Sequence, residues 1–461
     1  MATTLEPDTA RGELDDLQKL VALCKRRGFV FPSADIYGGF ANTYDYGPLG
    51  VLLKNNVRDA WIRAAVQRRD DVELLDAALI TSPKVWVASG HVAEFNDPLV
   101  QCLGDCKSRF RADQIDATKC PNCGGPLSEP RMFNTMFTTQ VGPIADADNV
   151  AYLPPETAQG IFVNFANVAA TMRRRLPFGI AQVRKSFRNE ITPGNFVFRT
   201  LEFEQMELEY FVEPGTDEEW FERWVDTREQ WYLELGIRAE HLRRFEHPQE
   251  KLSHYSKRTV DIEYRFPFGE GWGELEGIAN RSKGPDGTSW DLWRHEQSSG
   301  QRLTVFDEEK KQHVRPAVVE PAAGLTRAAL TFLIDAYEEQ VLDADKNDMR
   351  TVLHLHPALA PYKACILPQY RNKPDLVRVA RRVYEDLRRR WMITYDSGSN
   401  IGKLYRRQDE IGTPFCITID FQTLEDNKVT IRDRDTMDQS RFGRVPIPEL
   451  RGWLESQLAD F

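Results

Sequence analysis

Apolar residues recur at helical spacing in several segments of the chain. The first segment, residues 14–27, has Leu17 and Cys24 on one side of a predicted helix that ends in basic residues before a glycine. The second, residues 51–69, follows a Gly-Pro loop and carries an equally clear apolar side. Two more helices are predicted, one starting near residue 155 and one over residues 220–235.

Strand-forming residues surround a turn near the centre of the chain. Residues 187–191 and 196–207 are rich in aromatic and β-branched side chains and flank a Pro-Gly pair, which predicts two antiparallel strands. The stretch 187–210 also holds two arginines and five glutamates. Such charges are costly unless they are solvated or paired. The stretch therefore indicates either a surface hairpin rich in ion pairs or a site where arginines meet phosphates and glutamates meet a cation.

The pattern changes after a polar run at residues 343–348. Strand and helix then alternate, and this alternation predicts a small open α/β sheet. We therefore expect a domain boundary near residue 345. The predicted strands are 363–367, 392–395, 415–421 and 428–433, and the predicted helices are 374–391 and 400–411.

Composition narrows the class of protein. A length of 461 residues predicts two or three domains with ample core. The net charge of −10 excludes a globally basic nucleic-acid binder but leaves local basic patches open. No apolar run approaches the ~20 residues that a membrane span needs. Residues 1–12 are polar and lack a hydrophobic targeting core, so we expect a loose tail on a cytoplasmic protein.

Four of the seven cysteines cluster, which indicates a metal site rather than a disulfide framework. Three residues separate Cys102 from Cys106, and two separate Cys120 from Cys123, which precedes a Gly-Gly turn. Four thiolates suit tetrahedral zinc and leave no open coordination position, so we expect a structural Zn²⁺. Four reduced thiols without a metal are the alternative.

Three motifs resemble those of a known family. Residues 187–190 (FRNE), followed after a loop by Arg199 and Phe203, resemble motif 2 of the class II aminoacyl-tRNA synthetases. The Gly-Pro loop with Pro48 resembles motif 1, and residues 318–327 (VVEPAAGLTR) resemble motif 3. The sequence around motif 2 is similar to the homodimeric, single-polypeptide glycyl-tRNA synthetases, and this resemblance extends from about Lys19 to Phe461.

The resemblance implies an α+β fold with two domains. An antiparallel-sheet catalytic core would span 14–345 after a flexible tail (1–13), with a zinc-knuckle insertion at about 97–130 and a second insertion at about 213–265. An α/β anticodon-binding domain would span 346–461. The implied activity is ligation of glycine to tRNA(Gly) through glycyl-adenylate. The implied partners are glycine, tRNA(Gly) and a second copy of the chain, with ATP as substrate and Mg²⁺ as cofactor.

The resemblance gives catalytic roles to Arg188 and Arg327, whose planar guanidinium groups suit phosphates. Arg327 falls in the first turn of a predicted helix, where the helix dipole disfavours a cation unless an anion binds there. Glu274 would hold Mg²⁺; without the resemblance it is a solvent-facing glutamate on a glycine-flanked strand. The implied ATP-binding residues are Arg188, Asn189, Glu190, Phe198, Arg199, Thr200, Leu201, Glu202, Phe203, Glu274, Leu275, Gly324, Leu325, Thr326 and Arg327.

Glycine has no side chain to grip, so its selection needs negative charge for the ammonium group and small walls around the α-carbon. Glu156, Glu207 and Glu320 would supply the charge. Without the resemblance, Glu156 is a helix-dipole partner and Arg111 a solvated arginine, and both alternatives remain open. The implied glycine-binding residues are Arg111, Glu156, Phe203, Glu204, Gln205, Met206, Glu207, Glu320, Pro321, Ala322, Ala323 and Gly324.

The chain departs from the family pattern at three positions. Pro154 and Leu201 each replace an arginine that family members usually have, and Ala322 replaces a serine. Two other functions stay open. One is a class II synthetase for threonine, proline or histidine. The other is a catalytically altered paralogue that acts as an RNA-binding or accessory protein.

Overall fold

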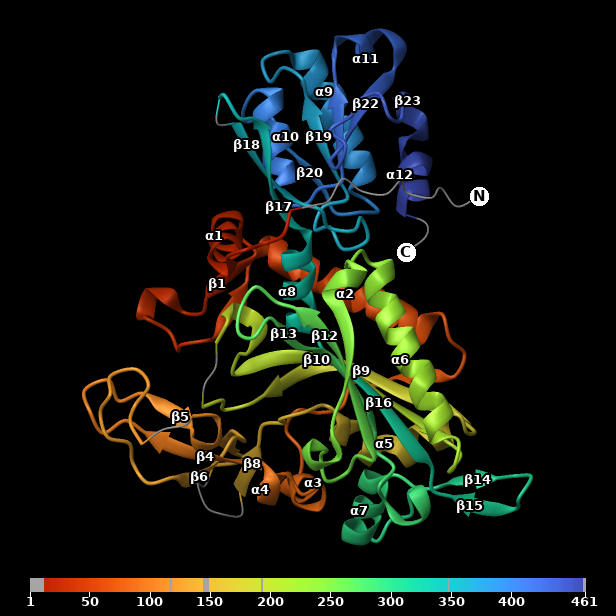
Figure 1. Ribbon diagram of the computed structural model, residues 1–461. Coiled ribbons are helices and arrows are strands. Elements are labelled where there is room, and N and C mark those ends of the chain that lie inside the picture. Colours follow the sequence, from red (N-terminus) through yellow and green to blue (C-terminus); the bar gives the residue numbers. More distant parts are fainter. Residues whose placement is uncertain (1–11, 116–117, 144–148, 192–193, 347, 459–461) are drawn as a thin grey trace.

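The computed structural model describes residues 12–115, 118–143, 149–191, 194–346 and 348–458. Most of the predicted tail, two residues of the predicted turn (192–193) and residue 347 of the polar run lie outside these ranges. Figure 1 shows a large part built around a twisted sheet, a cysteine-rich lobe beside it, and a smaller C-terminal part above it.

One seven-stranded sheet forms the centre of the large part, in the order β11-β12-β13-β16-β10-β9-β3. All neighbours pair antiparallel except β3 and β9, so the predicted antiparallel catalytic sheet is confirmed. The strands are β3 (Val72–Leu74), β9 (Phe178–Phe187), β10 (Glu202–Val212), β11 (Leu242–Glu246), β12 (Arg258–Arg265), β13 (Trp272–Asn280) and β16 (Ala317–Gly324).

Side-chain alternation gives this sheet one apolar and one polar face. In β10, Met206, Leu208 and Tyr210 belong to the main core, whereas Gln205 and Glu207 line a cavity on the other face. Four helices contribute buried side chains to that core: α1 (Leu17–Arg27), α2 (Pro48–Ile62), α6 (Asp217–Glu234) and α8 (Leu325–Ala336). A second core involves α5 (Ala158–Thr171) and α7 (Trp290–Ser299).

The connection from β9 to β10 differs from the predicted tight turn. Strand β9 ends at Phe187, and β10 begins only at Glu202. A short 3₁₀ helix, η5 (Phe196–Phe198), replaces the start of the predicted second strand. Phe196 and Val197 are buried in the main core, so tertiary packing overrides their strand propensity.

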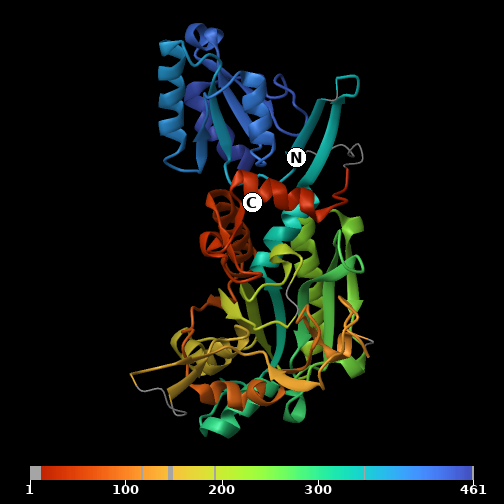
Figure 2. The same ribbon diagram turned by 90° about the vertical axis from the view of Figure 1, so that its left-hand side faces the viewer.

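Two predicted segments have more structure than the sequence indicated. Within the predicted insertion at about 213–265, β11 and β12 extend the central sheet. The polar run is not a linker but the tip of a hairpin between β17 (Tyr337–Asp343) and β18 (Asp348–Leu353). Figure 2 shows this hairpin beside the C-terminal part.

The C-terminal part is a five-stranded sheet in the order β20-β19-β21-β22-β23, in which β19 pairs parallel with β20 and β21. The predicted α/β alternation is confirmed, and β23, α11 and α12 are additional. The elements are β19 (Ala364–Pro368), α9 (Pro374–Leu387), β20 (Ile393–Tyr395), α10 (Ile401–Asp409), β21 (Phe415–Ile419), α11 (Phe421–Asp426), β22 (Lys428–Asp433), β23 (Arg444–Pro446) and α12 (Leu450–Leu458).

The remaining elements surround the central sheet, and a three-stranded sheet in the order β5-β4-β6 forms the base of the cysteine-rich lobe. Among the described residues, no helix is long and apolar enough to cross a membrane. These elements are α1 (Leu17–Arg27), β1 (Val30–Pro32), β2 (Tyr44–Tyr46), α3 (Pro83–Ala88), α4 (His91–Glu94), β4 (Asn96–Gln101), β5 (Arg109–Arg111), β6 (Arg131–Asn134), β7 (Thr138–Gln140), β8 (Val150–Tyr152), β14 (Val305–Asp307) and β15 (Gln312–Val314).

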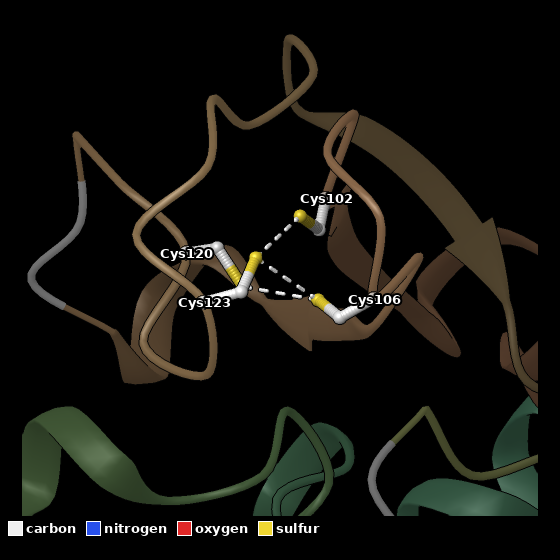
Figure 3. Close-up of side chains that lie close together, drawn as sticks. All are labelled: Cys102, Cys106, Cys120 and Cys123. Atoms are coloured by element: carbon white, nitrogen blue, oxygen red, sulfur yellow. Dashed lines mark hydrogen bonds between the residues drawn. The ribbon is translucent and has the colours of Figure 1, made fainter.

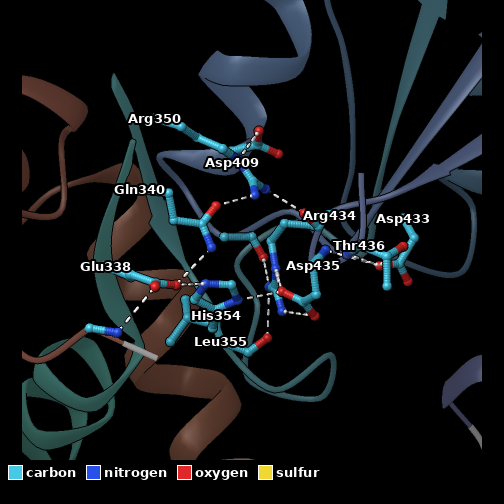
Figure 4. Close-up of polar contacts among 12 residues, drawn as sticks. Glu338, Gln340, Arg350, His354, Leu355, Asp409, Asp433, Arg434, Asp435 and Thr436 are labelled. Atoms are coloured by element: carbon cyan, nitrogen blue, oxygen red, sulfur yellow. Dashed lines mark hydrogen bonds and ion pairs between the residues drawn. The ribbon is translucent and has the colours of Figure 1, made fainter. Parts of the chain in front are cut away.

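A buried ion-pair network joins the β17–β18 hairpin to the C-terminal part (Figure 4). Asp409, at the end of α10, accepts a hydrogen bond of 2.9 Å from Arg350 Nε of β18. The same carboxylate accepts bonds of 2.8 and 3.0 Å from Arg432 of β22. Two guanidinium groups therefore depend on one carboxylate that is only 1% exposed.

His354 makes further contacts between the β17–β18 hairpin and the C-terminal part. One ring nitrogen lies 2.8 Å from Glu338 Oε2 of β17, and the other lies 2.6 Å from Asp435 Oδ1. Arg434 Nη1 donates hydrogen bonds of 2.8 Å to the carbonyls of Leu355 and Gly412. The hairpin is thus held to the C-terminal part through both side chains and backbone (Figure 4).

We expect Asp409→Asn to lower the free energy of unfolding by about 3–5 kcal/mol, because it leaves two buried guanidinium groups without a carboxylate. Urea denaturation measures this loss. Asp375→Asn is the matched control, since Asp375 pairs with Arg378 on an exposed helix face and contributes about 0–1 kcal/mol. Equal unfolding midpoints for the two variants would contradict the prediction.

Candidate active site

The polar face of the central sheet forms the floor of a cavity of about 390 Å³. Strands β10, β12, β13 and β16, the loop after β9 and the start of α8 all contribute to its lining. The lining residues are Glu156, Arg188, Glu190, Phe198, Arg199, Thr200, Phe203, Gln205, Glu207, His247, Ser253, Tyr255, Thr259, Asp261, Glu274, Gly277, Ala279, Glu320, Ala322, Gly324, Thr326 and Arg327.

Three guanidinium groups converge around Glu274 in this cavity. Arg327 Nη1 lies 3.2 Å from Glu274 Oε2 and donates a hydrogen bond of 2.9 Å to the Glu274 carbonyl. The positive charge of Arg327 lowers the pKa of Glu274, and the charges of Arg188 and Arg199 lower it further. Glu274 is therefore an ionised and half-exposed carboxylate among arginines.

Aromatic rings hold two of these arginines in place. The Arg188 guanidinium lies 5.5 Å from the Phe95 ring centroid and 5.4 Å from that of Phe203. Its Nε donates a hydrogen bond of 2.9 Å to the carbonyl of Pro155. Arg327 lies 4.4 Å from the Phe198 ring centroid. Cation–π contacts and the backbone bond thus orient both guanidinium groups before a ligand binds.

A second group of charges is buried around Arg281, which follows β13 and is fully buried. Its Nε and Nη2 each donate a bond of 2.9 Å to Asp291, and its Nη1 donates one of 2.7 Å to Glu320. Burial alone would lower the pKa of Arg281, but these two carboxylates raise it well above the ordinary value. The guanidinium is therefore a permanent cation behind the cavity wall.

Glu156 lies directly before Thr157, the N-cap residue of α5, and its carboxylate has side-chain partners of its own. His91 Nε2 lies 3.2 Å from Glu156 Oε2, and Gln159 donates a bond of 2.9 Å to Oε1. Burial alone would raise the pKa of Glu156, but the neighbouring His91 and Arg281 side chains lower it. The group is thus a buried, ionised carboxylate.

The pKa of Glu207 is shifted in the opposite direction from that of Glu156. Its carboxylate accepts a hydrogen bond from the hydroxyl of Thr157. Burial raises the pKa of Glu207 well above the ordinary value, and the carboxylates of Glu320 and Glu156 raise it further. Two glutamates in one cavity therefore hold their protons with different strength.

The cavity brings together most of the residues assigned by the family resemblance. Seven of the twelve predicted glycine-binding residues and ten of the fifteen predicted ATP-binding residues line it. Both predicted catalytic arginines are among them. The predicted residues outside the lining are Arg111, Glu204, Met206, Pro321 and Ala323 for glycine, and Asn189, Leu201, Glu202, Leu275 and Leu325 for ATP.

Strand alternation explains several of these exceptions. Met206 is buried in the main core, and Glu204, on the same face of β10, pairs with Lys54 of α2. Their side chains therefore lie on the sheet face opposite Gln205 and Glu207. Ala323 and Leu275 are likewise buried in the main core. The prediction of consecutive residues as one pocket ignored this alternation.

Arg111 has partners of its own. It pairs with Asp97 at 3.1 Å and with Asp113 at 2.7 Å, and it lies on β5 of the cysteine-rich lobe. The solvated-arginine interpretation is also incomplete, because both partners are carboxylates of the same lobe. In this structure, the lobe rather than the cavity holds the Arg111 side chain.

Sequence reasoning missed several residues of the cavity and its wall. Neither Arg281 nor His91 is among the site residues predicted from the sequence. A lone arginine after a glutamate-rich strand is a usable signal, because buried carboxylates need a counter-charge. The other missed residues are His247, Ser253, Tyr255, Thr259, Asp261, Gly277, Ala279 and Asp291.

The four clustered cysteines meet in the lobe, at the ends of two loops (Figure 3). Their sulfur atoms all lie within 4.8 Å of one another, and the Cys102–Cys123 and Cys106–Cys120 pairs are each 3.5 Å apart. These distances exclude disulfides, whose sulfurs are about 2.05 Å apart. They lie near the ~3.8 Å expected between ligands of a tetrahedral zinc with Zn–S bonds of about 2.3 Å.

Comparison with known proteins gives the same two-part division. Residues 137–337 match the model described as "tRNA synthetase class II core domain (G, H, P, S and T)", and residues 363–457 match "Anticodon binding domain". Proteins named "Glycine--tRNA ligase" from Cutibacterium acnes and Thermobifida fusca are 53% and 54% identical to this chain. The alignments cover 97% and 96% of this chain, respectively, and 98% of each relative.

A third such protein, from Bifidobacterium longum, is 55% identical over 96% of this chain and 93% of its own length. The antiparallel sheet, the arginine-lined cavity and both domain matches define a class II aminoacyl-tRNA synthetase. Within that class, the near-full-length similarity shows that the chain belongs to the glycine–tRNA ligase family.

We expect Arg281→Met to lower the free energy of unfolding by about 3–5 kcal/mol, because it leaves buried carboxylates without their cation. Adding Asp291→Asn is expected to cost less than the sum of the single effects, with a coupling of about 0.5–3 kcal/mol. Chemical denaturation of the four members of this cycle measures the coupling. Strict additivity would show that the two side chains do not interact.

Proposed function

We propose that this chain activates glycine with ATP and transfers the glycyl group to the 3′ end of tRNA(Gly). The observation that carries the proposal is one cavity lined both by Arg188, Arg199 and Arg327 and by buried glutamates. Guanidinium groups suit a triphosphate, and carboxylates suit an ammonium group. The family membership supports glycine as the amino acid.

In the first step, a carboxylate oxygen of glycine attacks the α-phosphorus of ATP, and the bond from that phosphorus to the bridging oxygen of pyrophosphate breaks. Arg188 would hold the α-phosphate and the glycine carboxylate in its fork. Arg199 and Arg327 would neutralise the remaining phosphates. In the second step, a terminal ribose hydroxyl of the tRNA attacks the carbonyl carbon and AMP leaves.

Glycine recognition would rest on charge and on small walls. Glu156, Glu207 and Glu320 line the cavity and would accept hydrogen bonds from the ammonium group. Ala322 and Gly324 line the same cavity and would form its small walls around the α-carbon. One extra methyl group in such a pocket costs about 1–3 kcal/mol.

Mg²⁺ fits the site through Glu274. This carboxylate is half exposed in the cavity and stays ionised because Arg327 lowers its pKa. Oxygen ligands of this kind suit Mg²⁺, which would supply charge neutralisation on the phosphates when bound. Glu274 would hold the ion, and the arginines would orient the phosphates around it.

Two of the three departures from the family pattern, Pro154 and Leu201, fit an active enzyme. The Pro154 carbonyl accepts a hydrogen bond of 2.8 Å from the Phe187 amide, and the Leu201 carbonyl accepts one of 3.0 Å from the Arg188 amide. Both positions therefore support motif 2 through backbone groups, which do not depend on the side chain. The altered-paralogue alternative is not favoured, and neither is a synthetase for another amino acid.

ATP–pyrophosphate exchange tests the activity. We expect exchange with glycine and not with alanine or serine, and Arg327→Ala is expected to lower the rate by about 10²–10³-fold through loss of phosphate stabilisation. Arg223→Ala, on an exposed face of α6, is the matched control and is expected to leave the rate unchanged. Exchange with no amino acid would refute the proposed activity, and exchange with another amino acid would refute the substrate.

We infer that the four cysteines hold one structural Zn²⁺, supported by the convergence of their sulfur atoms (Figure 3). Elemental analysis is expected to find one zinc per chain, and Cys106→Ser is expected to weaken its retention during dialysis against a chelator. Cys24→Ser, which lies in the main core away from the cluster, is expected to retain zinc. A folded, metal-free wild-type protein would contradict the inference.

We infer a homodimer from apolar side chains exposed beside motif 1. Ile36, Tyr37 and Phe40 are 82–88% exposed, and Leu74 on edge strand β3 is 53% exposed. Contiguous exposed apolar residues mark interaction surfaces, and two-fold pairing is the commonest assembly. We also infer a cytoplasmic location, supported by seven free cysteines.

Light scattering after size exclusion tests the dimer. The wild type is expected at twice the chain mass. The triple variant Ile36→Ser, Tyr37→Ser, Phe40→Ser removes exposed apolar area, so its dimer is expected to be weaker and to dissociate at higher protein concentrations than the wild-type dimer. Phe306→Ser is the control, since this exposed side chain lies on the distant β14–β15 hairpin. A monomeric wild type would contradict the inference.

A further inference from the structure

Glu209 is a buried carboxyl group that the proposed mechanism does not use. It lies on β10 two residues beyond Glu207, so both side chains are on the same face of the strand. It is 0% exposed and is not part of the cavity lining. Among the residues that the structure describes, none forms a hydrogen bond with either of its carboxyl oxygens.

Glu209 belongs to a compact group of three carboxyls. Oxygen atoms of Glu207, Glu209 and Glu320 all lie within 4.8 Å of one another, and all three groups are buried. Three carboxylates this close in a buried site cannot all be ionised, because each negative charge disfavours the others. The group therefore retains at least one proton.

The surroundings identify the carboxyl that holds this proton. Glu320 accepts a hydrogen bond from Arg281, and Glu207 accepts one from Thr157. Glu209 has neither kind of partner, and the charged groups that act on it are Arg281, Glu320, Glu207 and Asp291. Burial raises the pKa of Glu209 well above its ordinary value, and Glu320 raises it further.

A neutral carboxyl at this position has a hydrogen-bond donor that a carboxylate lacks. The acceptors nearest to it in the group are the oxygens of Glu207 and Glu320, which do line the cavity. A small closing movement of the side chains would let the Glu209 hydroxyl donate to either of them. Negative charge is then confined to the two groups that an ammonium ion can reach.

We propose that Glu209 is a neutral carboxylic acid that positions the Glu207 and Glu320 carboxylates for the ammonium group of the amino acid. This inference rests on the proposed function. Glu209 itself does not touch the substrate and is a positioning residue. It prevents a third negative charge beneath a pocket that receives a single positive one.

Substitutions that separate charge from hydrogen bonding test the proposal. Glu209→Gln keeps a neutral donor of nearly the same shape, so the KM for glycine in the exchange reaction is expected to change by less than about threefold. Glu209→Leu removes the donor and is expected to raise this KM about tenfold, which is the effect of one lost hydrogen bond. Both variants are expected to leave the KM for ATP unchanged.

Glu207→Gln is the matched comparison, because it removes a charge that the ammonium group would contact. It is expected to raise the KM for glycine by at least about tenfold. If Glu209→Gln raises the KM as much as Glu207→Gln does, Glu209 is an ionised group and the proposal is wrong. If Glu209→Leu behaves like Glu209→Gln, the donor has no role and the proposal is equally wrong.

Infrared difference spectroscopy gives a readout that does not depend on activity. The spectrum of the wild type minus that of Glu209→Gln, recorded at neutral pH without substrates, is expected to contain the C=O stretching band of a protonated carboxyl group. A difference spectrum with carboxylate bands alone would overturn the proposal. Absence of glycine-dependent exchange in the wild type would instead refute the proposed function, so the two failures are distinguishable.

Discussion

The alternation of side chains along the β-strands is the constraint on which the whole site depends. Each strand of the central sheet must bury one apolar face against α2, α6 and α8. Every second residue of the same strands therefore points toward the cavity. Gln205 and Glu207 reach the cavity because Met206 and Leu208 are fixed in the core. The packing of the helices therefore sets the position of the charged groups, and a slip of one residue in register would exchange the two sets.

A second constraint comes from charge. The cavity wall contains more buried carboxyl groups than buried cations, and Arg281 is the cation that Glu320 and Asp291 share. Its fixed charge stabilises some carboxylates and leaves others to hold protons. Glu156 lies on the ionised side of this division, and Glu209, whose oxygens accept no hydrogen bond from the described residues, lies on the protonated side. The pocket thus carries a graded distribution of negative charge rather than a uniform one.

The sequence predicted the antiparallel core, the C-terminal α/β sheet and the arginines of the cavity, because each depends on local spacing or on a short motif. It failed where tertiary packing decides. Residues 196–198 form a helical turn because Phe196 packs in the core. The polar run at 343–348 lies at the tip of a hairpin because β17 pairs with β18. Arg281 escaped notice because its partners Asp291 and Glu320 are 10 and 39 residues away in the chain. No local pattern encodes such a contact.

The buried Asp409 network has a mechanical consequence. Rotating the C-terminal part away from the hairpin requires the separation of Asp409 from the buried guanidinium group of Arg350, which costs about 3–5 kcal/mol. A detached state would then make up less than about 1% of the molecules, since 1.4 kcal/mol corresponds to a factor of ten. The hairpin and the C-terminal part therefore keep one relative orientation in nearly all molecules.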